Sequence, residues 1–231
     1  MALMALMALM ASPKRHLAIG DIHGCAVALD ALITAVQPTP VDTLVTLGDY
    51  VDRGPATKRV IELLLGLRGQ CQLVALRGNH ELMMLDAINS QAWLRPWLGA
   101  GGEATLSSYG GSFADIPDDH LEFLQHSLQP YFECDRYFFV HANTRADMPL
   151  DRQPDAALYW QKFRDPEAHV SGKIMVCGHT PQASGLPIRN DHAICIDTKV
   201  YADDGWLTCL EVESGVIWQA NESGATRQGC I

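Results

Sequence analysis

The stretch Gly48-Asp49-Tyr50-Val51-Asp52-Arg53-Gly54 directly follows the apolar run Leu44-Val45-Thr46-Leu47. It places two carboxylates and a guanidinium within the five residues from Asp49 to Arg53. The apolar run predicts a buried strand, and the polar stretch predicts a loop at its carboxyl end. In open α/β sheets the loops at the carboxyl ends of the strands form the binding crevice. The sequence therefore predicts ligand chemistry at this loop.

Two further stretches repeat this arrangement of an apolar run followed by a polar loop that contains glycine. Leu17-Ala18-Ile19 runs into Gly20-Asp21-Ile22-His23-Gly24, and Leu73-Val74-Ala75-Leu76 runs into Arg77-Gly78-Asn79-His80-Glu81. Taken alone, Gly-Asp and Gly-Asn pairs are ordinary turn chemistry. Three such loops in order, each with glycines that let the backbone turn sharply and with metal-capable side chains, indicate a metal site.

The order of the predicted elements indicates an α/β fold. Apolar spacing predicts helices from Cys25 to Val36 and from Val60 to Leu67, which alternate with the first three strands in a βαβαβ series of parallel strands. The predicted strands are 16–19, 43–47, 71–76, 131–134, 137–140, 174–177, 193–196, 207–212 and 216–219. We therefore predict a two-sheet β-sandwich flanked by helices, parallel in its first half and mostly antiparallel in its second.

Three further helices are predicted at 81–88, 118–128 and 155–164. Between the first two, the segment 91–112 contains Trp93, Trp97 and two glycine-rich turns, which predict a helical excursion with flexible joints. Such an insertion beside the third loop forms either one wall of a substrate cleft or a plain structural lobe.

The composition is that of a globular enzyme, with 231 residues, 48% hydrophobic and 19% charged. The net charge of −10, from 17 basic and 27 acidic residues, argues against a nucleic-acid or anionic-membrane partner. Any specificity for an anionic substrate must therefore come from local positive charge. The seven cysteines lack a CxxC spacing, which indicates reduced thiols in a reducing, cytoplasmic compartment.

The chain begins with a low-complexity repeat of Met, Ala and Leu up to Met10. A secretory signal has its positive charge before the apolar region, whereas Lys14 and Arg15 come after it, so a signal peptide is the weaker alternative. We predict a disordered extension over residues 1–13 and a single catalytic domain over 14–231. The oligomeric state is not encoded in any motif, and a monomer is the expectation.

Five blocks of the sequence resemble the signature motifs of the phosphoprotein phosphatase family of metallophosphoesterases, in its small bacterial and phage lambda phosphatase-like branch. Three are the loops described above, and the others are Phe139-Val140-His141-Ala142 and Val176-Cys177-Gly178-His179-Thr180-Pro181. The blocks occur in the family's order and cover about residues 16 to 200. The resemblance implies the calcineurin-like metallophosphoesterase fold.

The resemblance also implies two divalent metal ions and the side chains that hold them. Asp21 and His23 correspond to ligands of one ion, and Asp49 corresponds to the bridging carboxylate. The ligands of the other ion correspond to Asn79, His141 and His179. These oxygen and nitrogen donors suit manganese, iron or zinc, with manganese the expected ion in vitro.

Three residues resemble the family's catalytic set: His80 as the general acid, Asp52 as the carboxylate that orients it, and Arg53 as the phosphate-binding arginine. A guanidinium matches two phosphate oxygens in a fixed geometry. The family places a second phosphate-binding cation shortly after a tryptophan, and here Lys162 and Arg164 both follow Trp160. We slightly favour Arg164 for its bidentate geometry.

The main hypothesis is a phosphomonoesterase that acts on phosphoserine and phosphothreonine in proteins or peptides, with phosphotyrosine and aryl phosphates as further substrates. The resemblance implies direct attack by a hydroxide that bridges the two ions. The alternatives are a bis(5'-nucleosyl)-tetraphosphate hydrolase, which has a similar metal site, and a metal-binding regulatory domain without catalysis. Asp52 and Glu81 favour the protein phosphatase branch, because the second and third blocks usually differ in the dinucleotide hydrolases.

Overall fold

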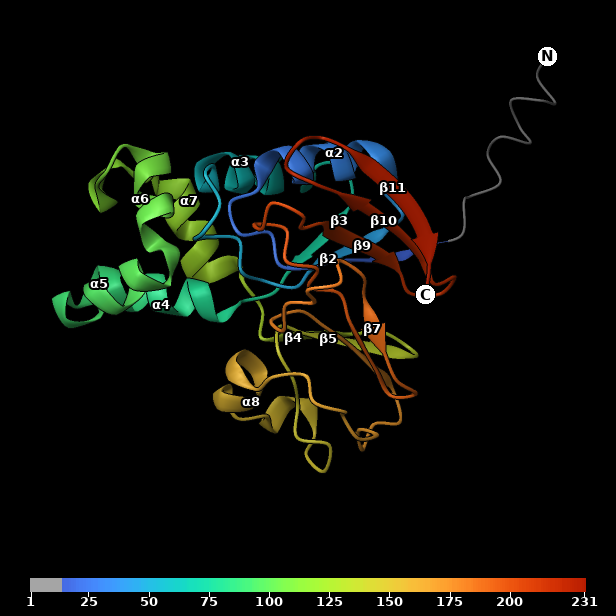
Figure 1. Ribbon diagram of the computed structural model, residues 1–231. Helices are drawn as coiled ribbons and strands as arrows, with labels where there is room; N and C mark the ends of the chain where they lie inside the picture. The colour runs from blue at the N-terminus through green and yellow to red at the C-terminus, as the bar shows by residue number, and fades with distance from the viewer. Residues whose placement is uncertain (1–13) are drawn as a thin grey trace, which may run out of the picture.

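The computed structural model describes residues 14–231, and the predicted extension over residues 1–13 lies outside the described residues. Two β-sheets face each other, with helices on their outer faces (Figure 1). One sheet has six strands in the order β11 (Thr226–Cys230), β10 (Val216–Ala220), β9 (Leu207–Glu211), β1 (His16–Ile19), β2 (Thr43–Thr46) and β3 (Gln72–Ala75). The other has five, in the order β4 (Tyr131–Glu133), β5 (Tyr137–Val140), β6 (Ile174–Cys177), β8 (Ala193–Cys195) and β7 (Ile188–Arg189).

Parallel strands form one side of the six-stranded sheet and the middle of the five-stranded sheet. In the six-stranded sheet β1, β2 and β3 are parallel, and β9 joins β1 antiparallel. In the five-stranded sheet β5, β6 and β8 are parallel, while β4 and β7 pair antiparallel at the edges. Because parallel strands end at the same edge, the loops after β1, β2, β3, β5 and β6 come together at one end of the sandwich.

Alternation along the strands divides the core into layers. Ala18 faces the five-stranded sheet, whereas its neighbours Leu17 and Ile19 pack under the helices. In β5, which belongs to the five-stranded sheet, Phe139 faces the six-stranded sheet. Phe138 points the opposite way, toward the helix that covers the five-stranded sheet. The two-sheet sandwich predicted from the sequence is confirmed.

Helices α2 (Ala26–Val36) and α3 (Thr57–Leu67) cover the six-stranded sheet, and α8 (Asp155–Trp160) covers the five-stranded sheet (Figure 1). The remaining helices form a lobe at the end of the sandwich that carries the loops. The lobe contains α4 (Asn79–Asn89), α5 (Gln91–Trp97), η1 (Leu98–Gly102), α6 (Glu103–Tyr109), η2 (Phe113–Asp115), α7 (Asp118–Glu122) and η3 (Phe123–Ser127), and a short turn η4 (Leu150–Arg152) precedes α8.

Three elements differ from the prediction. The helix predicted over 155–164 ends at Trp160, because Gln161 is extended and the Phe163 N–H donates to the Thr180 hydroxyl at 2.9 Å. Strands β7 and β11 were not predicted. They are edge strands, and β11 is exposed along its whole length, so neither has the apolar alternation by which a strand is recognised.

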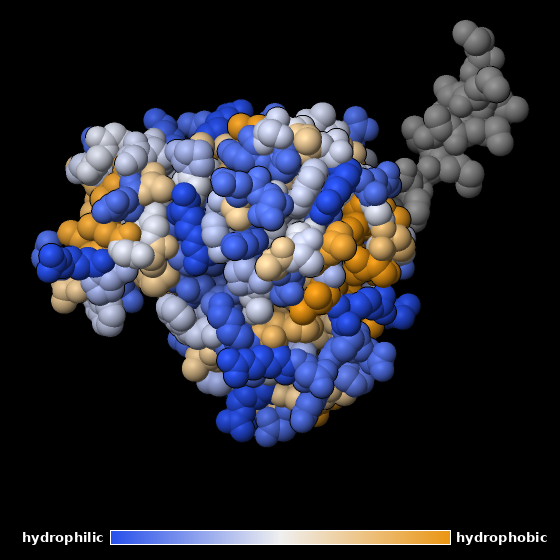
Figure 2. Space-filling model, viewed as in Figure 1, coloured by the Kyte–Doolittle hydropathy of each residue, from blue (hydrophilic) through white to orange (hydrophobic). Residues whose placement is uncertain are grey.

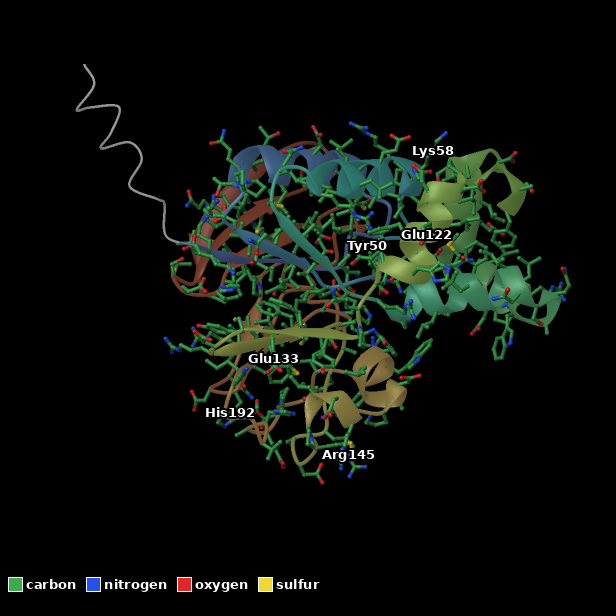
Figure 3. All side chains as sticks on the ribbon, turned by 180° about the vertical axis from the view of Figure 1, so that it is seen from behind. Tyr50, Lys58, Glu122, Glu133, Arg145 and His192 are labelled. Atoms are coloured by element: carbon green, nitrogen blue, oxygen red, sulfur yellow. The ribbon has the colours of Figure 1, made fainter. Side chains whose placement is uncertain are left out.

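The outer surface is largely polar. The face in Figure 2 is mostly hydrophilic, with apolar areas over the helical lobe and near β7 and the C-terminal end. Seen from behind in Figure 3, Tyr50 lies inside the molecule while Lys58, Glu133 and Arg145 lie on its outside. All seven cysteines are free thiols. In the described part of the chain, no helix has the length and apolar character needed to span a membrane.

A buried carboxylate ties the start of the domain to the loop before β2. Asp42 is fully buried and accepts hydrogen bonds from the Arg15 guanidinium, at 2.6 and 3.1 Å, and from Thr39. Burial alone would raise the pKa of Asp42, but the hydrogen bonds from Arg15 and Thr39 outweigh it and lower the pKa to about 2. The folded state therefore binds this proton less tightly than the unfolded chain does. The resulting stability is present above about pH 4 and is lost as the pH falls towards 2.

We expect Asp42→Asn to lower the free energy of unfolding by about 2 kcal/mol at pH 7, because the ion pair is lost and Arg15 keeps no charged partner. The difference from the unchanged protein should shrink as the pH falls from 4 towards 2. Urea denaturation at pH 7, 4 and 2.5 measures both effects. Asp30→Asn, at an exposed position of α2, is the matched control and should change stability by less than about 0.5 kcal/mol. An equal loss for Asp42→Asn at all three pH values would contradict the assignment.

Candidate metal centre

The loops at one end of the sandwich adopt backbone conformations that side-chain-bearing residues rarely take. Eight non-glycine residues have positive φ in the described chain, and six of them lie in these loops. The six are His23, Asp49, Asp52, Arg53, His179 and Lys199. Such strain persists only where the surrounding structure imposes it, and it gathers at functional sites.

Ring nitrogens of two histidines and the side-chain oxygen of one asparagine face one another. Asn79 Oδ1 lies 3.0 Å from His141 Nε2 and 3.1 Å from His179 Nδ1. The other ring nitrogens each carry a proton, because His141 Nδ1 donates to the Leu47 carbonyl and His179 Nε2 donates to the Trp160 carbonyl. Burial lowers the pKa of both rings, that of His179 to about 3, so both are neutral. Two bare nitrogens therefore face one amide oxygen.

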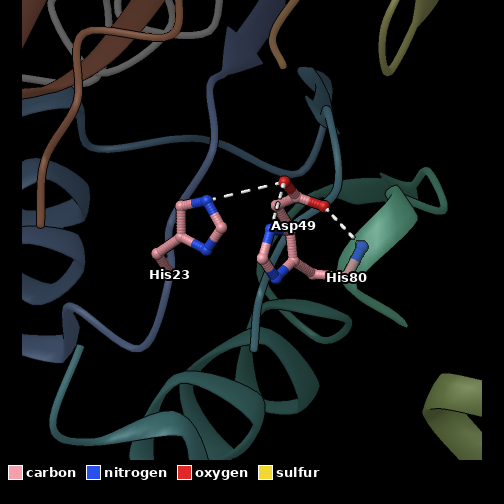
Figure 4. A group of neighbouring side chains, drawn as sticks. All are labelled: His23, Asp49 and His80. Carbon is pink, nitrogen blue, oxygen red and sulfur yellow. Dashed lines mark hydrogen bonds and ion pairs between the residues drawn. The ribbon is translucent and has the colours of Figure 1, made fainter. Parts of the chain in front are cut away.

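Asp49 joins this group to a second one. Its carboxylate lies 3.5 Å from His141 Nε2 on one side and 3.5 Å from His23 Nε2 on the other. Figure 4 shows Asp49 between His23 and His80. His23 Nδ1 donates to the Val51 carbonyl, so its bare Nε2 points into the site, where it accepts a hydrogen bond from Arg53 at 2.7 Å. His23 must release Arg53 before it can bind an ion.

Asp21 lies beside the two groups of converging side chains. Among the described residues, the His, Cys, Asp and Glu side chains that converge within 4.8 Å are His23 with Asp49 and His80, and Asp49 with His141 and His179. Asp21 belongs to neither group, and its carboxylate accepts the backbone N–H of His179 at 3.0 and 3.1 Å. The structure thus brings together five of the six predicted ligands and holds Asp21 beside them.

Negative charge is concentrated in this buried region. Burial, together with the nearby charges of Asp197 and Asp49, raises the pKa of Asp21 well above its ordinary value. Burial also raises the pKa of Asp197, to about 6, with a further contribution from Asp49. Buried carboxylates beside neutral imidazoles are compensated best by bound cations. The donor set therefore fits divalent metal ions with mixed oxygen and nitrogen ligands.

His80 differs from the three other histidines of the site. Its Nδ1 donates to Asp52 at 2.6 Å, and its Nε2 lies 4.0 Å from the Asp49 carboxylate. Burial lowers the pKa of His80, but Asp49 and the hydrogen bond to Asp52 outweigh this and raise it overall. Burial lowers the pKa of His23, His141 and His179. Opposite shifts divide the four rings into three neutral ligand candidates and one proton carrier.

Glu81 holds the loop that carries Asp49, although we assigned it no such role from the sequence. Its buried carboxylate accepts the backbone N–H groups of Asp49, Tyr50 and Gly78, at 2.7 to 2.9 Å, and that of Val51 at 3.3 Å. A Glu at the third position of the helix that begins with Asn79 is the sequence signal of such a cap.

Two more residues near the site were missed by sequence reasoning. Asp197 directly follows the apolar run 193–196, which contains β8, and this is the same signal that identified Asp49. Tyr201 stacks on Arg53, with the guanidinium carbon 4.6 Å from the ring centre, and meets His23 edge to face at 5.1 Å. No strand end or sequence block singled out Tyr201.

The two candidates for the second phosphate-binding cation separate clearly. Lys162 Nζ donates to the His179 carbonyl at 2.9 Å, and its charge contributes to lowering the pKa of His141 and His179. Arg164 instead lines a separate hollow of about 290 Å³ with Asn143 and Glu167. The chain is no longer helical after Trp160, so the predicted helix ends before it reaches either cation. The geometry therefore favours Lys162 over Arg164, which we had slightly preferred.

A model of the calcineurin-like phosphoesterase family matches residues 14–204, which include every loop described above. The chain belongs to the calcineurin-like phosphoesterase family and is a metallophosphoesterase, a hydrolase. The resemblance seen in the sequence motifs is confirmed, as is the fold that it implies.

Known proteins similar to this chain are named for different substrates. Serine/threonine-protein phosphatase 1 of Salmonella typhimurium is 41% identical over 194 residues, which are 78% of this chain and 85% of that protein. The symmetrical bis(5'-nucleosyl)-tetraphosphatase of Burkholderia thailandensis is 32% identical over 149 residues, 64% of this chain and 46% of that protein. A cold-active protein-tyrosine phosphatase of Shewanella shares the fold, with a TM-score of 0.67 at 15% identity over 94% of this chain and 80% of that one.

Gly78 leaves the room that Asp49 occupies, and this gives a test of the metal centre. A Cβ at Gly78 would overlap Asp49 Oδ1 and the Asp49 backbone nitrogen, although the φ of Gly78 is −100° and suits any residue. We expect Gly78→Ala to displace the carboxylate and weaken manganese binding at least about 10-fold, as measured by calorimetry. Gly66→Ala is the control, since a Cβ there meets nothing within 4 Å. Unchanged manganese affinity in a folded Gly78→Ala protein would refute this role of Asp49.

Proposed function

We propose that the protein is a metal-dependent phosphomonoesterase that removes phosphate from phosphoserine and phosphothreonine in proteins or peptides. The observation that carries this proposal is the buried pair of His80 and Asp52, with a 2.6 Å hydrogen bond, beside the candidate metal ligands. A serine or threonine alkoxide is a poor leaving group and needs a proton as it departs. A buried histidine that is hydrogen-bonded to a carboxylate, as a proton donor, is therefore most useful to an enzyme that cleaves alkyl phosphates.

The side chains around Asp49 have complementary parts in this reaction. Two divalent ions, when bound, supply an activated water and neutralise charge on the phosphate. Arg53 binds two phosphate oxygens through its planar guanidinium once it releases His23, and Lys162 adds a second positive charge at the far side of His179. His80 gives its Nε2 proton to the leaving oxygen, while Asp52 holds Nδ1 and stabilises the charged ring.

Hydrolysis of bis(5'-nucleosyl) tetraphosphates is the second candidate, and the 32% identity to the Burkholderia thailandensis enzyme favours it. The leaving group there is a nucleotide phosphate, which departs readily without a proton donor. The similarity to serine/threonine-protein phosphatase 1 is higher in identity and extends over more of both chains. These two considerations support the phosphomonoesterase. A regulatory domain without catalysis is the weakest alternative, since five of the six metal-ligand candidates lie together and His80 lies beside them.

Initial rates on three substrates test the proposal. Chelator-stripped protein is reloaded with manganese and given a phosphoserine peptide, a phosphotyrosine peptide or diadenosine tetraphosphate, with a metal-free control. We expect manganese-dependent phosphate release from the phosphoserine peptide at a rate at least about 10-fold above cleavage of the dinucleotide. A preference for diadenosine tetraphosphate would replace the proposal by the second candidate. Turnover of none of them by manganese-loaded protein would favour the regulatory domain.

Separate substitutions of the two cations test the assignment of phosphate binding. We expect Lys162→Ala to lower kcat/KM for the phosphopeptide about 10-fold or more, because a charge beside the candidate metal centre is lost. Arg164→Ala should change it less than about 2-fold, because Arg164 lines a different hollow. Steady-state kinetics on the manganese-loaded variants measure both. The reverse pattern would show that Arg164 holds the phosphate.

A further inference from the structure

The helical lobe contacts the loop after β2 on its buried side. This loop carries Asp52 and Arg53. Its helix α5 ends at Trp97 and its helix α6 carries Thr105, and both side chains are buried. Trp93, in the same lobe, is 56% exposed. The buried face of the lobe therefore includes two hydrogen-bonding side chains in addition to its apolar ones, and both are directed at Asp52.

The contacts with Asp52 fix both its carboxylate and its backbone. Trp97 Nε1 donates to the carboxylate and lies 3.0 Å from each of its oxygens. The Thr105 hydroxyl donates to Oδ1 at 2.9 Å and accepts the backbone N–H of Asp52 at 2.8 Å. Together with His80 Nδ1 on Oδ2, the fully buried carboxylate has three side-chain donors.

The indole ring is itself held in one orientation. It stacks on Phe113, with ring centres 5.3 Å apart and planes 25° apart, and it packs against Gly102, where any Cβ would overlap the ring. The neighbouring Gly101 has a φ of 115°, and its carbonyl accepts the backbone N–H of Arg53 at 3.1 Å. One turn of the lobe thus sets the positions of Asp52 and of Arg53.

A carboxylate that orients an imidazole works only if it is itself prevented from turning. Asp52 has a positive φ of 72°, so its local backbone does not hold it in a favourable conformation. Trp97 and Thr105 supply the restraint from an element far along the chain. Groups that orient the partner of a reacting side chain commonly change activity by 10-fold to 100-fold when removed.

We propose that Trp97 and Thr105 are positioning residues for the reaction: they hold the Asp52 carboxylate so that it aims the His80 ring at the leaving oxygen. The inference rests on the proposed function, which makes His80 the proton donor. It gives the segment 91–112 a role that sequence analysis left open between a cleft wall and a plain lobe. The lobe completes the acid side of the active site.

Leaving-group dependence tests this inference. Trp97→Phe keeps an aromatic ring and removes the N–H, so we expect turnover of a phosphoserine peptide to fall about 10-fold. Turnover of p-nitrophenyl phosphate should fall less than about 2-fold, because nitrophenolate departs without a proton. Thr105→Ala should show the same selectivity, and Thr105→Ser, which keeps the hydroxyl, should restore the peptide rate. Manganese content is measured for every variant, and Trp93→Phe is the control with both rates unchanged.

His80→Asn separates failure of the inference from failure of the proposed function. If His80→Asn lowers the rates on both substrates equally, His80 is not the proton donor. The inference and the proposed function are then both overturned. A second outcome is that His80→Asn lowers mainly the rate on the peptide, while folded Trp97→Phe and Thr105→Ala lower neither rate or lower both rates equally. In that case the inference alone is wrong. In the His80→Asn background, Trp97→Phe should change the peptide rate less than about 2-fold. A further full 10-fold loss there would show a general structural effect instead.

Discussion

The burial of the Asp49 carboxylate between two groups of histidines is the constraint on which the rest of the site depends. A charge removed from water needs compensation close by. Asp49 accepts the backbone N–H of His80 at 3.1 Å, and His23 and His141 each approach it within 3.5 Å. The absence of a side chain at Gly78 leaves the carboxylate its space, and Glu81 holds the backbone that carries it. The conformations of the loops after β2 and β3 therefore depend on each other.

The environment of each ring, and not its chemical type, assigns its part in the site. Burial lowers the pKa of three histidines and keeps them neutral, while hydrogen bonds from Nδ1 or Nε2 to main-chain carbonyls fix the tautomer and turn one bare nitrogen of each ring inward. His80 has a carboxylate as its partner instead, and its pKa shifts the other way. Neutral rings suit metal binding, and a charged ring suits proton donation. One buried cluster can therefore hold both functions a few ångströms apart.

The helical lobe contacts the residues beside the metal-ligand candidates. Its segment 91–112 reaches the second loop through Trp97, Gly101 and Thr105, which contact Asp52 and Arg53. Tyr201, from the loop after β8, approaches Arg53 from another direction. Arg53 and Asp52 are thus held by residues 45 to 148 positions away in sequence, about which local sequence patterns say nothing.

The sequence by itself determined the sheet architecture and most of the candidate ligands, because strand ends are local features: an apolar run followed by Gly-Asp, Gly-Asn or His is visible within ten residues. It also indicated the separate histidine-carboxylate pair. Only the tertiary structure placed Lys162, and not Arg164, against the His179 carbonyl, set Asp21 against the His179 N–H, and brought Trp97, Glu81 and Tyr201 to the site. Edge strands β7 and β11 escaped prediction for the same reason that the lobe contacts did. Their positions follow from packing between distant segments, and such packing leaves no periodic signal in the chain.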